Sequence, residues 1–74
     1  MKYADEFRRW LTERRKANRD EVSLIDVLLN AFTIMHKLGY ERAVRVHPIP
    51  EAVDAVKGLY EWFVADIERN LREG

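Results

Sequence analysis

Cysteine and glutamine are absent from this chain of 74 residues, and it has only two prolines and three glycines. Without cysteine it cannot form a disulfide or a thiolate metal site. The two histidines, His36 and His47, have no third ligand at a recognisable spacing, so we predict no metal and no other cofactor. A domain this small usually needs an additional source of stability, and we expect it to come from oligomerisation.

Catalytic motifs are missing as well. The chain has no glycine-rich phosphate loop, no HExxH zinc motif, no ExxH pair for a di-metal bundle and no cysteine nucleophile. We therefore predict a protein that is not an enzyme. The one remaining catalytic hypothesis is a site around His36 at a dimer interface, since a histidine among apolar residues is a candidate pH-sensitive group.

The composition nevertheless predicts a folded domain. Hydrophobic residues make up 47% of the chain, which is enough for a core, and the length fits one domain over residues 1–74. Arginine outnumbers lysine nine to four, a profile typical of a thermophile or of a GC-rich genome. The first ten residues are rich in charge and lack the apolar region of a signal peptide, so we expect a cytoplasmic protein.

The longest apolar run is VSLIDVLLNAFTIMHKL, which predicts a helix over residues 21–38. Apolar side chains cover most of the circumference of this helix, so it should be buried on several sides. Asp26 and Asn30 in its middle argue against a membrane span, and we expect no membrane association. Asn18 or Asp20 is expected to cap its first turn, and Gly39 to end it in a left-handed conformation.

Two further helices are predicted over residues 3–17 and 50–71, from apolar residues at helical spacing. The expected fold is all-α, a small three-helix bundle with helix 21–38 in the centre. Three helices cannot easily cover a helix that is apolar nearly all round, so we expect a symmetric homodimer to complete the core. The candidate interface residues are Ile25, Leu29, Phe32 and His36.

The segment from Tyr40 to Ile49 has three alternative interpretations: strand, helical turn or loop. Residues 43–47 alternate like a short strand. A helical turn followed by an extended connection is favoured, because Pro48 and Pro50 impose extended geometry on the residues before them. Ile49 is expected to pack on the core as an apolar anchor.

A basic face of helix 3–17 is the first candidate contact surface. Residues 1–19 hold seven Lys or Arg and three Asp or Glu, whereas residues 20–74 hold six and ten. This face indicates either contact with the phosphates of a nucleic acid or an ordinary solvated helix face. It consists of Arg8, Thr12, Arg15, Lys16 and Arg19.

The second candidate surface surrounds Trp62, which lies off the apolar stripe of helix 50–71 among small residues. A tryptophan on a shallow helix face is typical of a protein-binding hot spot. The alternative is that helix 3–17 or the 40–50 segment covers it within the chain. The candidate residues are Trp62, Gly58, Ala55 and Asp66.

These observations predict a small adaptor or regulatory protein that acts as a homodimer and binds an unidentified protein partner. The formal net charge of zero and the absence of catalytic motifs favour this function. The alternative is a nucleic-acid-binding regulator that uses the basic face of helix 3–17.

Overall fold

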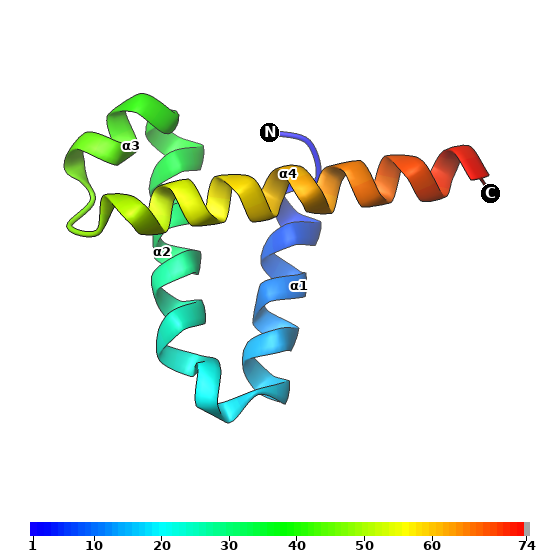
Figure 1. The fold of residues 1–74 in the computed structure, drawn as a ribbon, viewed down its shortest axis with the longest axis horizontal. Coiled ribbons are helices and arrows are strands. Elements are labelled where there is room, and N and C mark those ends of the chain that lie inside the picture. Colours follow the sequence, from blue (N-terminus) through cyan, green and yellow to red (C-terminus); the bar gives the residue numbers. More distant parts are fainter. Residues whose placement is uncertain (74) are drawn as a thin grey trace.

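The computed structural model describes residues 1–73, and its regular structure is entirely helical (Figure 1). Two helices, α1 and α2, form an antiparallel hairpin, and α4 crosses one end of it while α3 occupies the corner between α2 and α4. The all-α prediction is confirmed, although four helices replace the expected three. The elements are α1 Ala4–Ala17, a 3-10 turn η1 Arg19–Glu21, α2 Val22–Leu38, α3 Tyr40–Val46 and α4 Pro50–Glu73.

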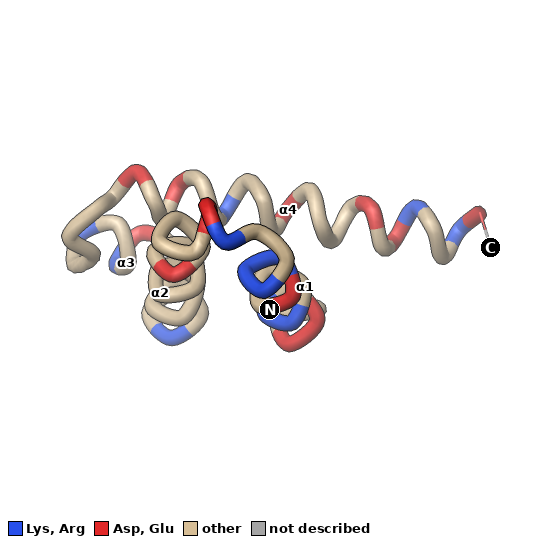
Figure 2. Tube along the Cα trace, turned by 90° about the horizontal axis from the view of Figure 1, so that it is seen from below, with Lys and Arg blue, Asp and Glu red and all other residues tan. Residues whose placement is uncertain are grey.

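The helices lie in two layers. Viewed along the hairpin, α4 forms one layer, and α1 and α2 lie side by side in the other (Figure 2). α4 has 24 residues, about 36 Å of helix, and its C-terminal part extends past α1. None of the helices within residues 1–73 is long and apolar enough to cross a membrane.

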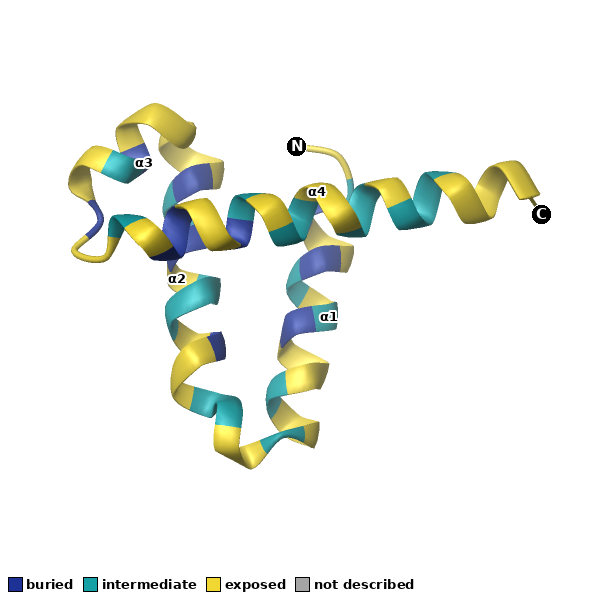
Figure 3. Cartoon of the chain, viewed as in Figure 1, coloured by how far each residue is buried: buried dark blue, intermediate teal, exposed yellow. Residues whose placement is uncertain are grey.

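The core lies where α4 crosses the hairpin, and most buried residues gather there (Figure 3). Phe7 of α1 is fully buried at this point, and its ring centre is 4.8 Å from that of Phe32 on α2 and 5.4 Å from that of Phe63 on α4. Aromatic packing of this kind contributes about 0.5–1.5 kcal/mol per pair beyond the burial of surface. One cluster of rings therefore holds both layers together.

The predicted end of α2 at Gly39 is confirmed, and the predicted N-terminal cap is wrong. Gly39 ends the helix with a φ of 85°, and its N–H donates to the Met35 carbonyl at 2.8 Å, although its ψ of 164° is more extended than in the left-handed helix. Neither Asn18 nor Asp20 caps the first turn, because η1 intervenes and Glu21 occupies the cap position without a side-chain hydrogen bond. The Asn18 side chain instead donates to the Arg14 carbonyl at the end of α1.

The segment after Gly39 forms a short helix and then an extended connection, so the favoured alternative is confirmed and the strand is wrong. The expected anchor is also wrong, because Ile49 is 43% exposed and His47 is 5% exposed. The Nδ1 of His47 accepts the Ile49 N–H at 2.9 Å, and its Nε2–H donates to Asn30 Oδ1 at 2.9 Å. A buried imidazole with both nitrogens paired thus ties the connection to α2.

α2 packs against α1, α3 and α4, in keeping with its expected central place. Ile25 and Phe32 are 2% and 0% exposed, so two of the four residues expected at a dimer interface belong to the core of the single chain. Leu29 is partly buried, and His36 is exposed. The apolar surface that α2 leaves uncovered lies elsewhere, chiefly at Leu24, which is 59% exposed.

Candidate functional site

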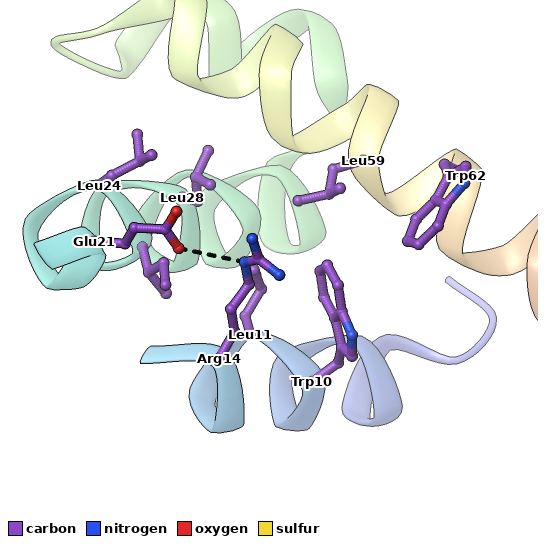
Figure 4. A pocket seen from close by; sticks show the side chains of 9 residues that line it. Trp10, Leu11, Arg14, Glu21, Leu24, Leu28, Leu59 and Trp62 are labelled. Carbon is purple, nitrogen blue, oxygen red and sulfur yellow. Dashed lines mark ion pairs between the residues drawn. The ribbon is translucent and has the colours of Figure 1, made fainter. Parts of the chain in front are cut away.

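An apolar groove of about 400 Å³ lies where the uncovered half of the hairpin meets α4 (Figure 4). It exists because α4 crosses the hairpin near one end only, and no further helix within residues 1–73 covers the rest. We call it the tryptophan groove, because both tryptophans of the chain line it. Its lining residues are Trp10, Leu11 and Arg14 of α1, Glu21 of η1, Leu24, Ile25 and Leu28 of α2, and Leu59 and Trp62 of α4.

The two tryptophans form one wall of the groove. Their ring centres are 5.9 Å apart, and Trp10 also packs on Phe63 at 5.7 Å. Trp62 remains 54% exposed despite this contact. Helix α1 therefore packs on one side of the Trp62 ring without covering it, so cover by helix 3–17 is found only in part, and the role of Trp62 in protein binding stays a prediction.

The opposite wall comes from Leu24 and Leu28, one helical turn apart on α2 (Figure 4). Leu24 points out of the packed layers with more than half of its surface in solvent, and Leu28 is partly buried. Sequence analysis expected this helix to be buried on several sides and placed its uncovered surface at Ile25, Leu29, Phe32 and His36. The exposed leucine was missed because periodicity shows that a face is apolar but not whether another element covers it.

An ion pair closes the rim of the groove. Arg14 Nε is 3.4 Å from a Glu21 carboxylate oxygen, and the Arg14 guanidinium lies 5.9 Å from the centre of the Trp10 ring. A cation over an indole face is attracted to it by about 0.5–1 kcal/mol at an exposed site. The rim is therefore formally neutral, and the groove presents mainly apolar surface.

The other residues predicted around Trp62 do not line the groove. Ala55 and Gly58 are exposed on α4, and a Cβ atom added at Gly58 would meet no atom within 4 Å. Asp66 forms an ion pair with Arg69 on the same helix. Among the four residues predicted for this surface, only Trp62 belongs to the groove.

The basic face of α1 is largely paired within the chain. Arg15 Nε is 2.7 Å from an Asp26 carboxylate oxygen on α2, and Lys16 is 3.6 Å from Glu13. The Thr12 hydroxyl donates to a backbone carbonyl of α1. Acidic residues are interspersed among the basic ones along α1 (Figure 2).

Arg8 belongs to the same face and also lies against other groups of the chain. Its guanidinium is 3.7 Å from Asp5, donates to His36 Nδ1 at 3.2 Å, and sits over the Phe32 ring. Arg19 has no ion pair within residues 1–73. Sequence analysis missed Asp26 and His36 as partners, because the antiparallel hairpin brings them beside α1 from far along the chain.

A smaller pocket of about 320 Å³ lies near the N-terminus of α3, between the side chains of Tyr40, Lys57 and Tyr60. The Tyr40 hydroxyl donates to Asp54, and this hydrogen bond, followed by partial burial and the negative charge of Asp54, raises the pKa of Tyr40. Burial raises the pKa of Tyr60. Both phenols are thus held in the neutral form, as hydrogen-bonding groups of the scaffold.

Within residues 1–73, no group of three or more His, Asp or Glu side chains is placed to hold a metal ion. Comparisons with protein-family models, with characterised proteins and with solved structures gave no match for this chain. The tryptophan groove is the feature whose composition and exposure are most distinctive of a binding site.

Proposed function

We propose that this chain is a small non-enzymatic adaptor or regulatory protein that acts as a homodimer and binds protein through the tryptophan groove. The observation that supports this proposal is the pairing of Trp10 and Trp62 beside the exposed Leu24. Tryptophan is enriched at interaction hot spots, where a rigid aromatic ring contributes a large apolar area at small entropic cost.

An amphipathic helix fits this groove best as a ligand. The walls are helices on three sides, and Leu24 and Leu28 repeat at the spacing of one helical turn. A helix that lies in a groove of this kind inserts apolar side chains at positions i, i+3, i+4 and i+7. The neutral rim formed by Arg14 and Glu21 favours recognition by apolar contact over recognition by charge.

Nucleic-acid binding by the basic face of α1 has weaker support. Three of its four cationic residues, Arg8, Arg15 and Lys16, already lie beside carboxylates of the same chain. Exposed pairs of this kind are worth only about 0.2–1 kcal/mol each, but a phosphate that binds any of these three residues competes with the carboxylate beside it. The face also lacks an aromatic residue on which a base could stack.

The proposal is tested by cross-linking the purified chain to proteins of its source cell and comparing groove variants with a control. Leu24→Glu and Trp62→Ala should each abolish the specific cross-linked partner. Val46→Glu is the matched control, since Val46 is as exposed as Trp62 at 54% but lies on α3 away from the groove. Partner capture that survives both groove variants would contradict the proposal.

A further inference from the structure

We propose that the occupant of the tryptophan groove is a second copy of this chain, and that it inserts the C-terminal end of its own α4. Each copy would give its α4 end to the groove of the other, forming a reciprocal dimer. This inference rests on the proposed function, because it names the partner of that same groove.

The end of α4 carries an apolar stripe that is packed at its first residue, partly buried in its middle and exposed at its last residue. Tyr60, Val64, Ile67 and Leu71 follow one another at spacings of four, three and four residues, which places them on one face of the helix. Tyr60 packs on Phe7 and Phe32 in the core, whereas Leu71 is 69% exposed. The stripe therefore continues past the hairpin into solvent (Figure 3).

The exposed surface of the chain is larger than that of a typical monomer. A folded monomer of 8.8 kDa should expose about 4,800 Å², whereas this chain exposes 5241 Å². The extended end of α4 and the open groove account for surface that a compact chain would bury. A second copy that covers both would remove this excess.

The groove and the protruding end of α4 are arranged so that each of two copies can place its helix end in the groove of the other. Trp62 borders the groove, and residues 64–73 continue the same helix beyond it (Figures 1 and 4). A two-fold axis perpendicular to the two layers would place the α4 helices side by side and antiparallel. Each apolar stripe would then face the uncovered half of the partner's hairpin, and such an isologous contact closes after two copies.

The charges of the two elements also favour this arrangement. α4 carries six carboxylates and three basic side chains, whereas α1 carries five basic and three acidic ones. Within one chain the two helices cross (Figure 1), and none of the ion pairs within residues 1–73 joins α1 to α4. In the reciprocal dimer the end of α4, whose residues 64–73 hold three carboxylates and two arginines, lies across the basic α1 of the other copy, so the contact joins elements of opposite net charge.

Sedimentation equilibrium over a wide concentration range tests the inference on the full chain. We expect a mass of twice 8.8 kDa at high concentration, and an increase of at least about tenfold in the dimer dissociation constant for either Leu24→Glu or Leu71→Glu. Both residues are more than half exposed, so neither change should prevent folding. Val46→Glu, at a residue of α3 that is also more than half exposed, should leave the constant unchanged.

Disulfide trapping identifies the contact itself, and the chain has no cysteine of its own to interfere. Under oxidation, a mixture of Leu24→Cys and Leu71→Cys chains should give a cross-linked dimer between the two variants. A mixture of Leu71→Cys and Val46→Cys chains should not. Dimers that form without this selectivity, or that tolerate Leu71→Glu, would overturn the inference.

The outcomes separate this inference from the proposed function. A chain that stays monomeric at all concentrations, but loses a cellular partner on Leu24→Glu, overturns the second-copy occupant and leaves the binding function intact. A monomer whose partner capture is insensitive to Leu24→Glu overturns both. A dimer that is lost on both substitutions supports both.

Discussion

His47 is a buried polar residue in a chain whose core is otherwise apolar within residues 1–73. Its two ring nitrogens bond to the Ile49 N–H and to Asn30 Oδ1. With Nδ1 as acceptor, the ring is the neutral tautomer that carries its proton on Nε2. This side chain therefore ties the connection between α3 and α4 to α2, beside the helix that borders the groove.

Replacing His47 with alanine should lower the free energy of unfolding by about 2 kcal/mol, because it removes a buried ring and leaves the Ile49 N–H without its acceptor. Urea denaturation followed by far-UV circular dichroism measures this change. Val46→Ala, next to it but half in solvent, should alter the free energy by less than about 0.5 kcal/mol. Equal effects from the two substitutions would contradict the structural role of His47.

At the scale of the residue, an anchor was predicted in the correct segment, but at Ile49, whereas the buried residue is His47. Ile49 is the more hydrophobic candidate, but it lies between Pro48 and Pro50 with 43% of its surface exposed. His47 can be buried because Asn30 on α2 forms a hydrogen bond with its ring. The local pattern of apolar and polar residues does not reveal this hydrogen bond, because its two residues are 17 positions apart in the sequence.

At the scale of the element, α4 is a continuous helix despite the glycine in its interior. It is unbroken from Pro50 to Glu73 although Gly58 lies in its middle. Pro50 begins it with the φ that a first helical position requires, and Glu51 complements the positive helix end. Packing of its stripe against the hairpin outweighs the unfavourable helix propensity of the glycine.

Gly58→Ala should therefore stabilise the folded chain by about 1 kcal/mol, because a Cβ at this position meets nothing within 4 Å and alanine favours the helix. Gly39→Ala is the contrasting variant. Its φ of 85° with a ψ of 164° suits glycine almost alone, and alanine there should cost about 1–3 kcal/mol. Thermal unfolding of the two variants beside the wild type should shift the midpoint in opposite directions.

Helix positions were the most predictable feature at this scale. The expected ranges 3–17, 21–38 and 50–71 agree closely with α1, α2 and α4, since each has a long apolar period with a clear beginning or end. The crossing of α4 over the hairpin was not predictable, because it depends on which ring packs on Phe7. A bundle of three antiparallel helices was expected from the short junctions, whereas α4 crosses the hairpin of α1 and α2.

At the scale of the whole molecule, sequence analysis found one half of the groove. Trp62 was singled out because it lies off the apolar stripe of its helix. Trp10 and Leu24 were not singled out, because each lies on the apolar surface of its helix and periodicity does not show which part of that surface stays uncovered. The groove arises only when three helices meet, so its existence is a property of the tertiary arrangement.

Folding also brings charges together that are separated in the sequence. In the sequence, residues 8–19 read as a basic segment that faces an acidic remainder of the chain. In the folded chain, Arg15 reaches Asp26 on α2 and Arg14 reaches Glu21. The hairpin thus brings part of the acidic remainder beside the basic helix, and the long-range field of the basic face is reduced.

We therefore expect little affinity for nucleic acid. Titration of random-sequence duplex DNA, followed by fluorescence anisotropy at low and at moderate salt, should show only weak binding that Arg15→Ala and Arg19→Ala leave within about threefold. Arg15 is paired and Arg19 is not, so the two variants also compare a neutralised with an unneutralised cation. Tight binding that falls steeply with salt, and that Arg19→Ala weakens, would instead identify the basic face as the functional surface. The groove would then serve only to join two copies, whose paired basic faces would bind the duplex together.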